Sequence, residues 1–228
     1  MSESDGGKKA PGCKVVLLGD SGVGKTCLIS RYISGVYDSN SASTNGASYA
    51  SKEVTYEKLG KTLMLDIWDT AGQEKYKALT KFFYKDAAVA ILVYDITLKE
   101  SFENLKEYWY KQIQENGDKN MVLGIAGNKS DLYEEEAVPE AEAREFATSV
   151  GAIFQLTSAA TNAGVEKLFS DVGNKYLDPN FQQKIMEEKE EKEETTGQKI
   201  TLDKNEVKKK EKKFLLKFYL RLKLNWLL

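Results

Sequence analysis

Apolar residues recur along the first 178 positions of the chain in two alternating patterns. Continuous or alternating apolar runs predict strands over residues 14–18, 47–56, 61–69, 87–94, 121–126 and 153–157. Between most of these runs, apolar residues return every three or four positions, which predicts helices. Strands that are apolar on both faces are typical of a parallel sheet covered by helices on each side. We therefore expect an α/β fold over residues 11–178, with a six-stranded, mostly parallel sheet.

The predicted helices carry apolar stripes that we expect to face the core. The stripes are Phe102, Leu105, Trp109 and Ile113; Ala143, Phe146, Ala147 and Val150; and Val165, Leu168, Phe169, Val172 and Tyr176. An earlier helix follows the first strand and contains Cys27, Leu28, Tyr32 and Ile33. The strands at 47–56 and 61–69 have only a turn at Leu59 and Gly60 between them, which predicts an antiparallel hairpin.

The composition excludes several kinds of catalytic and metal-binding site. The chain has no histidine, which excludes Ser-His and Cys-His catalysis and every histidine-ligated metal site. Cys13 and Cys27 are too few for a zinc site or a disulfide framework, so we expect a reducing, cytoplasmic location. A net charge of -2 does not favour a nucleic-acid partner. The N-terminus lacks the apolar segment of a signal peptide, and the apolar stretch at 87–94 is too short to span a membrane.

The composition changes abruptly after residue 178. Residues 187–194 hold six acids and two bases, whereas residues 208–223 hold eight bases and one acid. We therefore expect a folded domain at 11–178, a disordered N-terminus at 1–10, and a charged linker and disordered tail at 179–228. Two interpretations of the basic, apolar tail stay open: weak peripheral contact with an anionic membrane, or sequence under no selection.

The segment from residue 19 to residue 26 reads GDSGVGKT and fits the phosphate-loop pattern G-x-x-x-x-G-K-[ST] between a strand and a helix. Glycines let successive backbone N–H groups face an anion, and the helix N-terminus adds its dipole. We expect Lys25 to reach the β- and γ-phosphates and Thr26 to bind Mg²⁺. The predicted phosphate contacts are Asp20, Ser21, Gly22, Val23, Gly24, Lys25, Thr26 and Cys27. The alternative is an incidental glycine-rich turn.

A second cluster of candidate residues follows the strand at 61–69. Asp69 ends that strand, where its carboxylate can hold the metal directly or through water. Gly72 can offer its N–H to the γ-phosphate, and Gln73 can orient the attacking water. We therefore predict Gln73, Lys25 and Gly72 as the catalytic residues.

Two further strand ends carry residues suited to a guanine base. Asn128, Lys129 and Asp131 belong to the segment NKSD, in which the aspartate can accept hydrogen bonds from the N1–H and 2-amino groups of guanine. Adenine lacks that donor pair, so such a site is selective. Ser158 and Ala159 follow the next strand, where a backbone N–H can reach the guanine O6.

GDSGVGKT, WDTAGQE, NKSD and TSA, in this order and spacing, resemble the small GTPases of the Ras superfamily. YDIT at 94–97, KYKALT at 75–80 and FYKDA at 83–87 resemble the Rab family, and STNGASY at 43–49 is similar to the switch segment of endocytic Rabs. The resemblance covers about residues 11–178. It implies the P-loop small-GTPase fold, with GTP or GDP and Mg²⁺ as cofactors.

By this resemblance, Thr44 is the switch threonine that contacts Mg²⁺ and the γ-phosphate, and Tyr37 packs on the guanine ring. The metal ligands are then Thr26, Thr44 and Asp69. The implied function is a switch that slowly hydrolyses GTP and regulates intracellular vesicle trafficking. Effectors, an exchange factor and a GTPase-activating protein would bind its switch regions, with the protein cytoplasmic or peripheral on endomembranes. The alternatives are a GTP-binding interaction module with little turnover and no stable membrane attachment, and a P-loop ATPase or kinase.

Three features depart from the family pattern. Asn45 stands where the family usually has an apolar residue, and Ala160 stands where a lysine often follows the Ser-Ala pair. No cysteine follows Cys27. Because prenylation requires a C-terminal cysteine, we expect that the usual Rab lipid anchor cannot be attached.

Overall fold

The computed structural model describes residues 10–39, 48–70 and 84–180. Its sheet has six strands in the order β2-β3-β1-β4-β5-β6. Their bounds are β1 Gly12–Leu18, β2 Ser48–Tyr56, β3 Lys61–Asp69, β4 Val89–Asp95, β5 Val122–Asn128 and β6 Ile153–Leu156. Only the β2–β3 pair is antiparallel, and the other neighbouring strands run parallel. The predicted fold class is confirmed.

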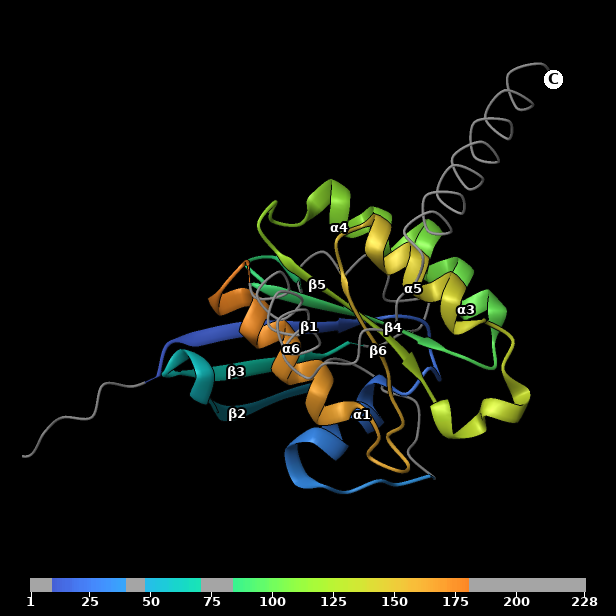
Figure 1. Cartoon of the computed structure of the whole chain (residues 1–228), viewed down its shortest axis with the longest axis horizontal. Helices are drawn as coiled ribbons and strands as arrows, with labels where there is room; N and C mark the ends of the chain where they lie inside the picture. Colours follow the sequence, from blue (N-terminus) through green and yellow to red (C-terminus); the bar gives the residue numbers. More distant parts are fainter. Residues whose placement is uncertain (1–9, 40–47, 71–83, 181–228) are drawn as a thin grey trace, which may run out of the picture. The chain divides into compact units, whose positions relative to one another are not determined.

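Helices cover both faces of this sheet (Figure 1). Their bounds are α1 Lys25–Ser34, α3 Lys99–Asn104, α4 Lys111–Asn116, α5 Glu140–Ser149 and α6 Val165–Leu177. Short helical turns lie at η1 Glu57–Leu59 and η4 Ser130–Glu135. A π-helical turn, η3 Leu105–Tyr110, joins α3 to α4, and the residues at both junctions keep right-handed helical dihedral angles. Residues 99–116 therefore form one continuous helix with a wide turn in its middle.

Two apolar layers hold the helices to the sheet. On one face, α1 and α6 pack together over the sheet, with the Tyr32 and Phe169 rings stacked 3.9 Å apart between their centroids. On the other face, α5 and the helix at 99–116 bury Phe102 and Trp109. The central strand β4 is buried along its whole length because both layers cover it.

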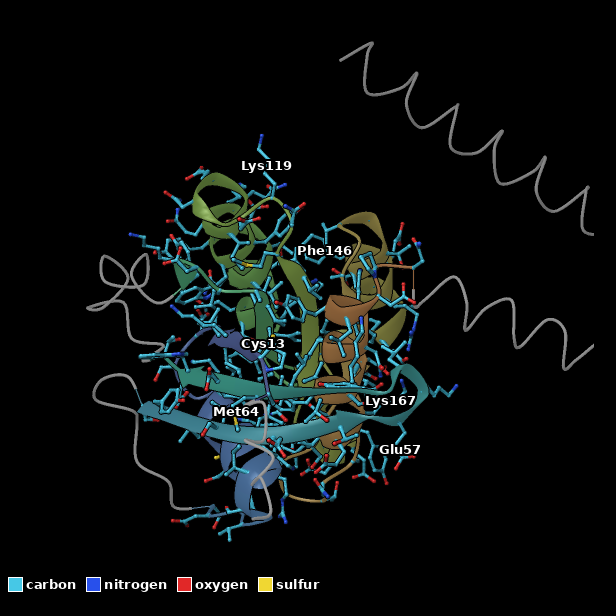
Figure 2. The ribbon with its side chains drawn as sticks, turned by 90° about the vertical axis from the view of Figure 1, so that its left-hand side faces the viewer. Cys13, Glu57, Met64, Lys119, Phe146 and Lys167 are labelled. Carbon is cyan, nitrogen blue, oxygen red and sulfur yellow. The ribbon has the colours of Figure 1, made fainter. Side chains whose placement is uncertain are left out.

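Most of the predicted stripes face the core. Phe102, Leu105, Trp109 and Ile113 are buried, as are the first four members of the α6 stripe. Phe146 of α5 (Figure 2) and Val150, just after α5, are only partly buried. Phe146 fills the space between helices by contacting the rings of Phe102 and Tyr110. The prediction for Tyr176 was wrong. Its side chain is 38% exposed, because Leu177 packs against the core at this end of α6 instead.

The β2–β3 hairpin closes as predicted. Gly60 adopts a left-handed conformation with φ of 58°, and its N–H donates to the carbonyl of Glu57, which lies at the end of the hairpin (Figure 2). The register pairs Leu17 with Asp69 and Asp95 with Asn128. The carboxyl ends of β1, β3, β4 and β5 therefore meet at one edge of the sheet, where ligands of open α/β sheets bind.

Candidate functional site

In the loop between β1 and α1, the backbone at two glycines lies very close to neighbouring groups. Gly19 and Gly24 have φ of 147° and 95°. A Cβ at Gly19 would lie 2.2 Å from the carbonyl oxygen of Val93, and one at Gly24 would lie 2.3 Å from Nδ2 of Asn128. Any side chain at either position would clash with its neighbour. Glycine is therefore required here by packing as well as by dihedral angle.

Lys25 is the first residue of α1 and is almost fully buried, with 5% of its surface exposed. Its ammonium donates to the carbonyl oxygens of Gly19 and Asp20, both at 2.8 Å. Burial lowers the pKa of this amine to about 8, and the nearby carboxylates of Asp69 and Asp20 act in the opposite direction. The side chain thus places a cationic donor beside the glycine-rich loop.

Thr26 and Asp69 come together although 43 residues separate them. The threonine hydroxyl donates to a carboxylate oxygen of Asp69 at 2.6 Å, and Asp69 is 1% exposed at the end of β3. Hydroxyl and carboxylate oxygens are the ligands that Mg²⁺ takes. Within the described residues, no three carboxylates or cysteines cluster as a metal cage. This donor set fits an ion that takes its other ligands from water and substrate phosphates.

The two predicted base-recognition segments also meet. The Ser158 hydroxyl donates to the carboxylate of Asp131 and accepts the N–H of Thr161 at 3.0 Å. The backbone N–H of Ser130 donates to the carbonyl of Thr157 at 3.0 Å. The loops after β5 and β6 therefore form one surface with the Asp131 carboxylate on it.

Asn128 joins this surface to the phosphate loop. Its Nδ2 donates to the carbonyl oxygen of Val23 at 2.8 Å, while its Oδ1 accepts the hydroxyl of Thr157 at 3.2 Å. The side chain is buried. The sequence predicts that Asn128 contacts the nucleotide, and the described contacts show that its side chain also braces two loops against each other. Lys129 has φ of 64°, and its ammonium pairs with Asp95 at 2.6 Å.

Arg31 is a site residue that sequence reasoning missed. Its guanidinium donates to three carbonyl oxygens, those of Gly35 at 2.6 Å, Ala159 at 2.7 Å and Ala160 at 2.9 Å. It also lies 5.9 Å from the centre of the Tyr37 ring. One side chain thereby ties the base loop to the end of α1. Because Ala160 is held through its backbone, the missing lysine at that position does not leave this loop without support.

The structure brings together most of the predicted residues that it describes. Lys25, Thr26 and Asp69 form one group, and Asn128, Asp131 and Ser158 form the other. Tyr37 lies beside Arg31 and is 41% exposed. Thr44, Asn45, Gly72 and Gln73 lie outside the described residues. So does the tail at 181–228, and no helix in the described ranges is long and apolar enough to cross a membrane.

A model of the Ras family matches residues 14–178, which is more than half of the chain. The chain belongs to the Ras family. Human Rab-31 is 44% identical to this Ras-family protein over 170 residues, covering 73% of the chain and 85% of Rab-31. Human Rab-22A is 44% identical over 163 residues, covering 71% and 82%, and rat Rab-31 is 43% identical over 170 residues, covering 73% and 85%. The predicted resemblance to Rab proteins is confirmed.

Proteins of this family are GTPases that bind GTP and GDP, typically with Mg²⁺. This Ras-family chain is accordingly a Rab-type GTPase that regulates vesicle trafficking. The predicted enzyme class is confirmed, and neither a P-loop kinase nor a module without turnover is favoured.

The Arg31 contacts yield a prediction about nucleotide release. Arg31→Lys keeps the charge but loses the planar fork that reaches three carbonyls, so the base loop should loosen. We expect GDP dissociation to accelerate by about tenfold, the change produced when a charge-assisted hydrogen bond is lost. Stopped-flow release of a fluorescent GDP measures this rate. The matched control is Arg144→Lys on α5, whose guanidinium pairs with Glu140 at the surface. Equal dissociation rates in the two variants would contradict the prediction.

Proposed function

We propose that this GTPase binds GTP across the carboxyl edge of its sheet, with the phosphates in the glycine-rich loop and the guanine between the loops after β5 and β6. The observation that carries this proposal is the buried Asn128 amide, which bonds to the carbonyl of Val23 and to the hydroxyl of Thr157. Phosphate loop and base loops are thereby fixed to each other. A ligand with both a triphosphate and a base suits such a site.

In this proposal, the backbone from Asp20 to Cys27 and the Lys25 ammonium bind the phosphates. Thr26 and Asp69 hold Mg²⁺ together with Thr44, with Asp69 acting through water. Bound Mg²⁺ would neutralise charge on the phosphate oxygens. The support is the chemistry of the described pair, since a hydroxyl and a buried carboxylate lie 2.6 Å apart at the start of α1.

For the base, Asp131 accepts the N1–H and 2-amino groups of guanine, and Ser158 holds the carboxylate in place. The N–H of Ala159 reaches the guanine O6. Arg31 supports this arrangement because it binds the carbonyls of Ala159 and Ala160 and so holds the loop. Tyr37 packs on the guanine ring. These assignments explain why the base loop is fastened at so many points.

Hydrolysis is assigned to Gln73, which orients the water, and to the N–H of Gly72, which contacts the γ-phosphate. A second cation would speed this step by stabilising the transferring phosphoryl group. Both arginines among the described residues are engaged elsewhere, Arg31 with loop carbonyls and Arg144 with Glu140. We therefore propose that a GTPase-activating protein supplies an arginine in trans.

Rab proteins work with effectors, exchange factors and activating proteins on endomembranes. We propose that these partners bind the segments around Thr44 and Gly72, which the γ-phosphate orders and hydrolysis releases. The folded GTPase domain is proposed to span 11–178. The basic residues from position 208 onward are proposed to make weak contact with anionic membrane, because five lysines within 208–213 precede an apolar stretch that holds three more bases.

The base assignment predicts the effect of Asp131→Asn. This change replaces part of the acceptor pair with a donor, so the site should prefer xanthine to guanine nucleotides. We expect GTP affinity to fall by about 100-fold or more while xanthosine triphosphate affinity rises, measured by competition against a fluorescent nucleotide. Asp171→Asn, which removes a surface carboxylate paired with Lys167, is the matched control. Wild-type protein that binds ATP as tightly as GTP would show that the base assignment is wrong.

The catalytic assignment predicts that Gln73→Leu retains GTP binding and loses stimulated hydrolysis, because leucine cannot orient water. Turnover with an activating protein should fall to near the intrinsic rate, on the order of 10⁻⁴ per second. Phosphate release in single-turnover experiments measures both rates. Gln114→Leu on α4 is the control, since its amide donates to the Tyr110 hydroxyl within the same helix at 99–116. Unchanged stimulated hydrolysis in Gln73→Leu would remove this residue from the site.

The membrane proposal predicts binding to liposomes that contain anionic lipid. Binding should weaken as salt rises above 0.1 M, where the screening length is about 10 Å, and should vanish on truncation after Asp178 while GTP binding survives. Co-sedimentation of the full chain and the truncated form tests this. Neutral liposomes are the control. If the protein sedimented with neutral liposomes to an extent that salt did not change, the electrostatic contact would be refuted.

A further inference from the structure

The side chain of Asp20 makes contacts that no part of the proposed nucleotide chemistry uses. Asp20 is the second residue of the phosphate loop. Nδ2 of Asn104 donates to its Oδ2 at 2.7 Å, and Nε1 of Trp109 donates to its Oδ1 at 2.8 Å. Each carboxylate oxygen therefore has its own donor, and both donors come from the helix at 99–116. Trp109 is 1% exposed, so its N–H is held in a fixed position.

A carboxylate in this loop presents an electrostatic problem. The loop binds anions through its backbone N–H groups, and a negative side chain beside bound phosphates would repel them. Asp20 is close to this chemistry, because its own carbonyl accepts the Lys25 ammonium at 2.8 Å. Two donors that fix the carboxylate limit how far it can turn toward a bound phosphate.

The π-helical turn explains how one helix supplies both donors. Asn104 and Trp109 are five positions apart. In an α-helix, residues five apart differ by about 140° around the axis, so they project from different faces. A π turn pairs position i with i+5 and brings such residues one above the other. The turn η3 spans Leu105–Tyr110, directly after Asn104.

The π turn keeps its apolar side chains in the core. Leu105 and Trp109 are buried within it, and Ile113 in α4 is also buried. The π conformation is rare and is found often at functional sites. Its presence where the helix touches the phosphate loop is a second observation, made on the backbone rather than on the two side chains.

We propose that Asn104 and Trp109 are positioning residues of the nucleotide site, which hold the Asp20 carboxylate clear of bound phosphate and so set the affinity of the phosphate loop. This inference rests on the phosphate-binding role proposed above for the loop. It adds a contribution from a helix that carries none of the recognised sequence motifs.

The first test removes the donors. Trp109→Phe keeps an aromatic side chain, smaller than indole, but lacks the N–H, and Asn104→Ala lacks the amide. We expect each variant to bind GDP about tenfold more weakly, and the double variant more weakly still. The ratio of GDP to xanthosine diphosphate affinity should stay unchanged, because the base loops are untouched. Tyr110→Phe is the control, since it removes a hydroxyl of the same π turn that accepts a hydrogen bond from Gln114 rather than binding Asp20.

The second test is rescue. Asp20→Asn, introduced into the double variant, replaces the freed carboxylate with a neutral amide and should restore most of the lost GDP affinity. If the two residues only pack the helix on the sheet, the defect would persist and the inference would be overturned. Full GDP affinity in the double variant, with an unaltered thermal unfolding midpoint, would overturn it as well. Failure of the wild-type protein to bind GDP would instead count against the proposed phosphate site.

Discussion

The buried amide of Asn128 is the contact on which the geometry of the site depends. It reaches the carbonyl of Val23 on one side and the hydroxyl of Thr157 on the other. Gly24 permits this approach, because a Cβ there would lie 2.3 Å from the amide nitrogen. A buried polar group that loses its partner costs about 1 to 3 kcal/mol, so the structure favours this one arrangement strongly. One buried side chain therefore links the phosphate loop directly to the base loops.

Electrostatics adds a second constraint, because an anion site lies among acidic side chains. β3 and β4 end in an aspartate, the segments that follow β1 and β5 each add another at this edge, and each aspartate is engaged by a donor. The pairs are Asp20 with Asn104 and Trp109, Asp69 with Thr26, Asp95 with Lys129, and Asp131 with Ser158. Directed donors hold each carboxylate in one place, so negative side chains can serve as ligands or braces without filling the phosphate site.

The sheet supplies the rigid support for these contacts. β1 and β4 lie in its middle and are buried on both faces by the two helical layers. Loops that leave such strands start from fixed positions, which is what a site built from four separate loops requires. Arg31 adds a further support outside the strands, since its guanidinium holds the base loop to the end of α1. Under the proposed binding mode, the affinity for nucleotide thus depends on parts of the fold that do not touch it.

The sequence by itself determined the six strands, the helical stripes, the hairpin turn and the identity of the main nucleotide segments, because each depends on residues that are near one another in the chain. Periodicity and motif spacing are local properties. Only the tertiary structure decided which donors reach Asp20, from 84 and 89 residues away, and which carbonyls Arg31 holds, from 128 and 129 residues away. It also decided that a π turn interrupts the helix at 99–116 and that Tyr176 is exposed. The physical reason is that a hydrogen bond needs its two atoms within about 3 Å, and packing of distant segments sets that distance.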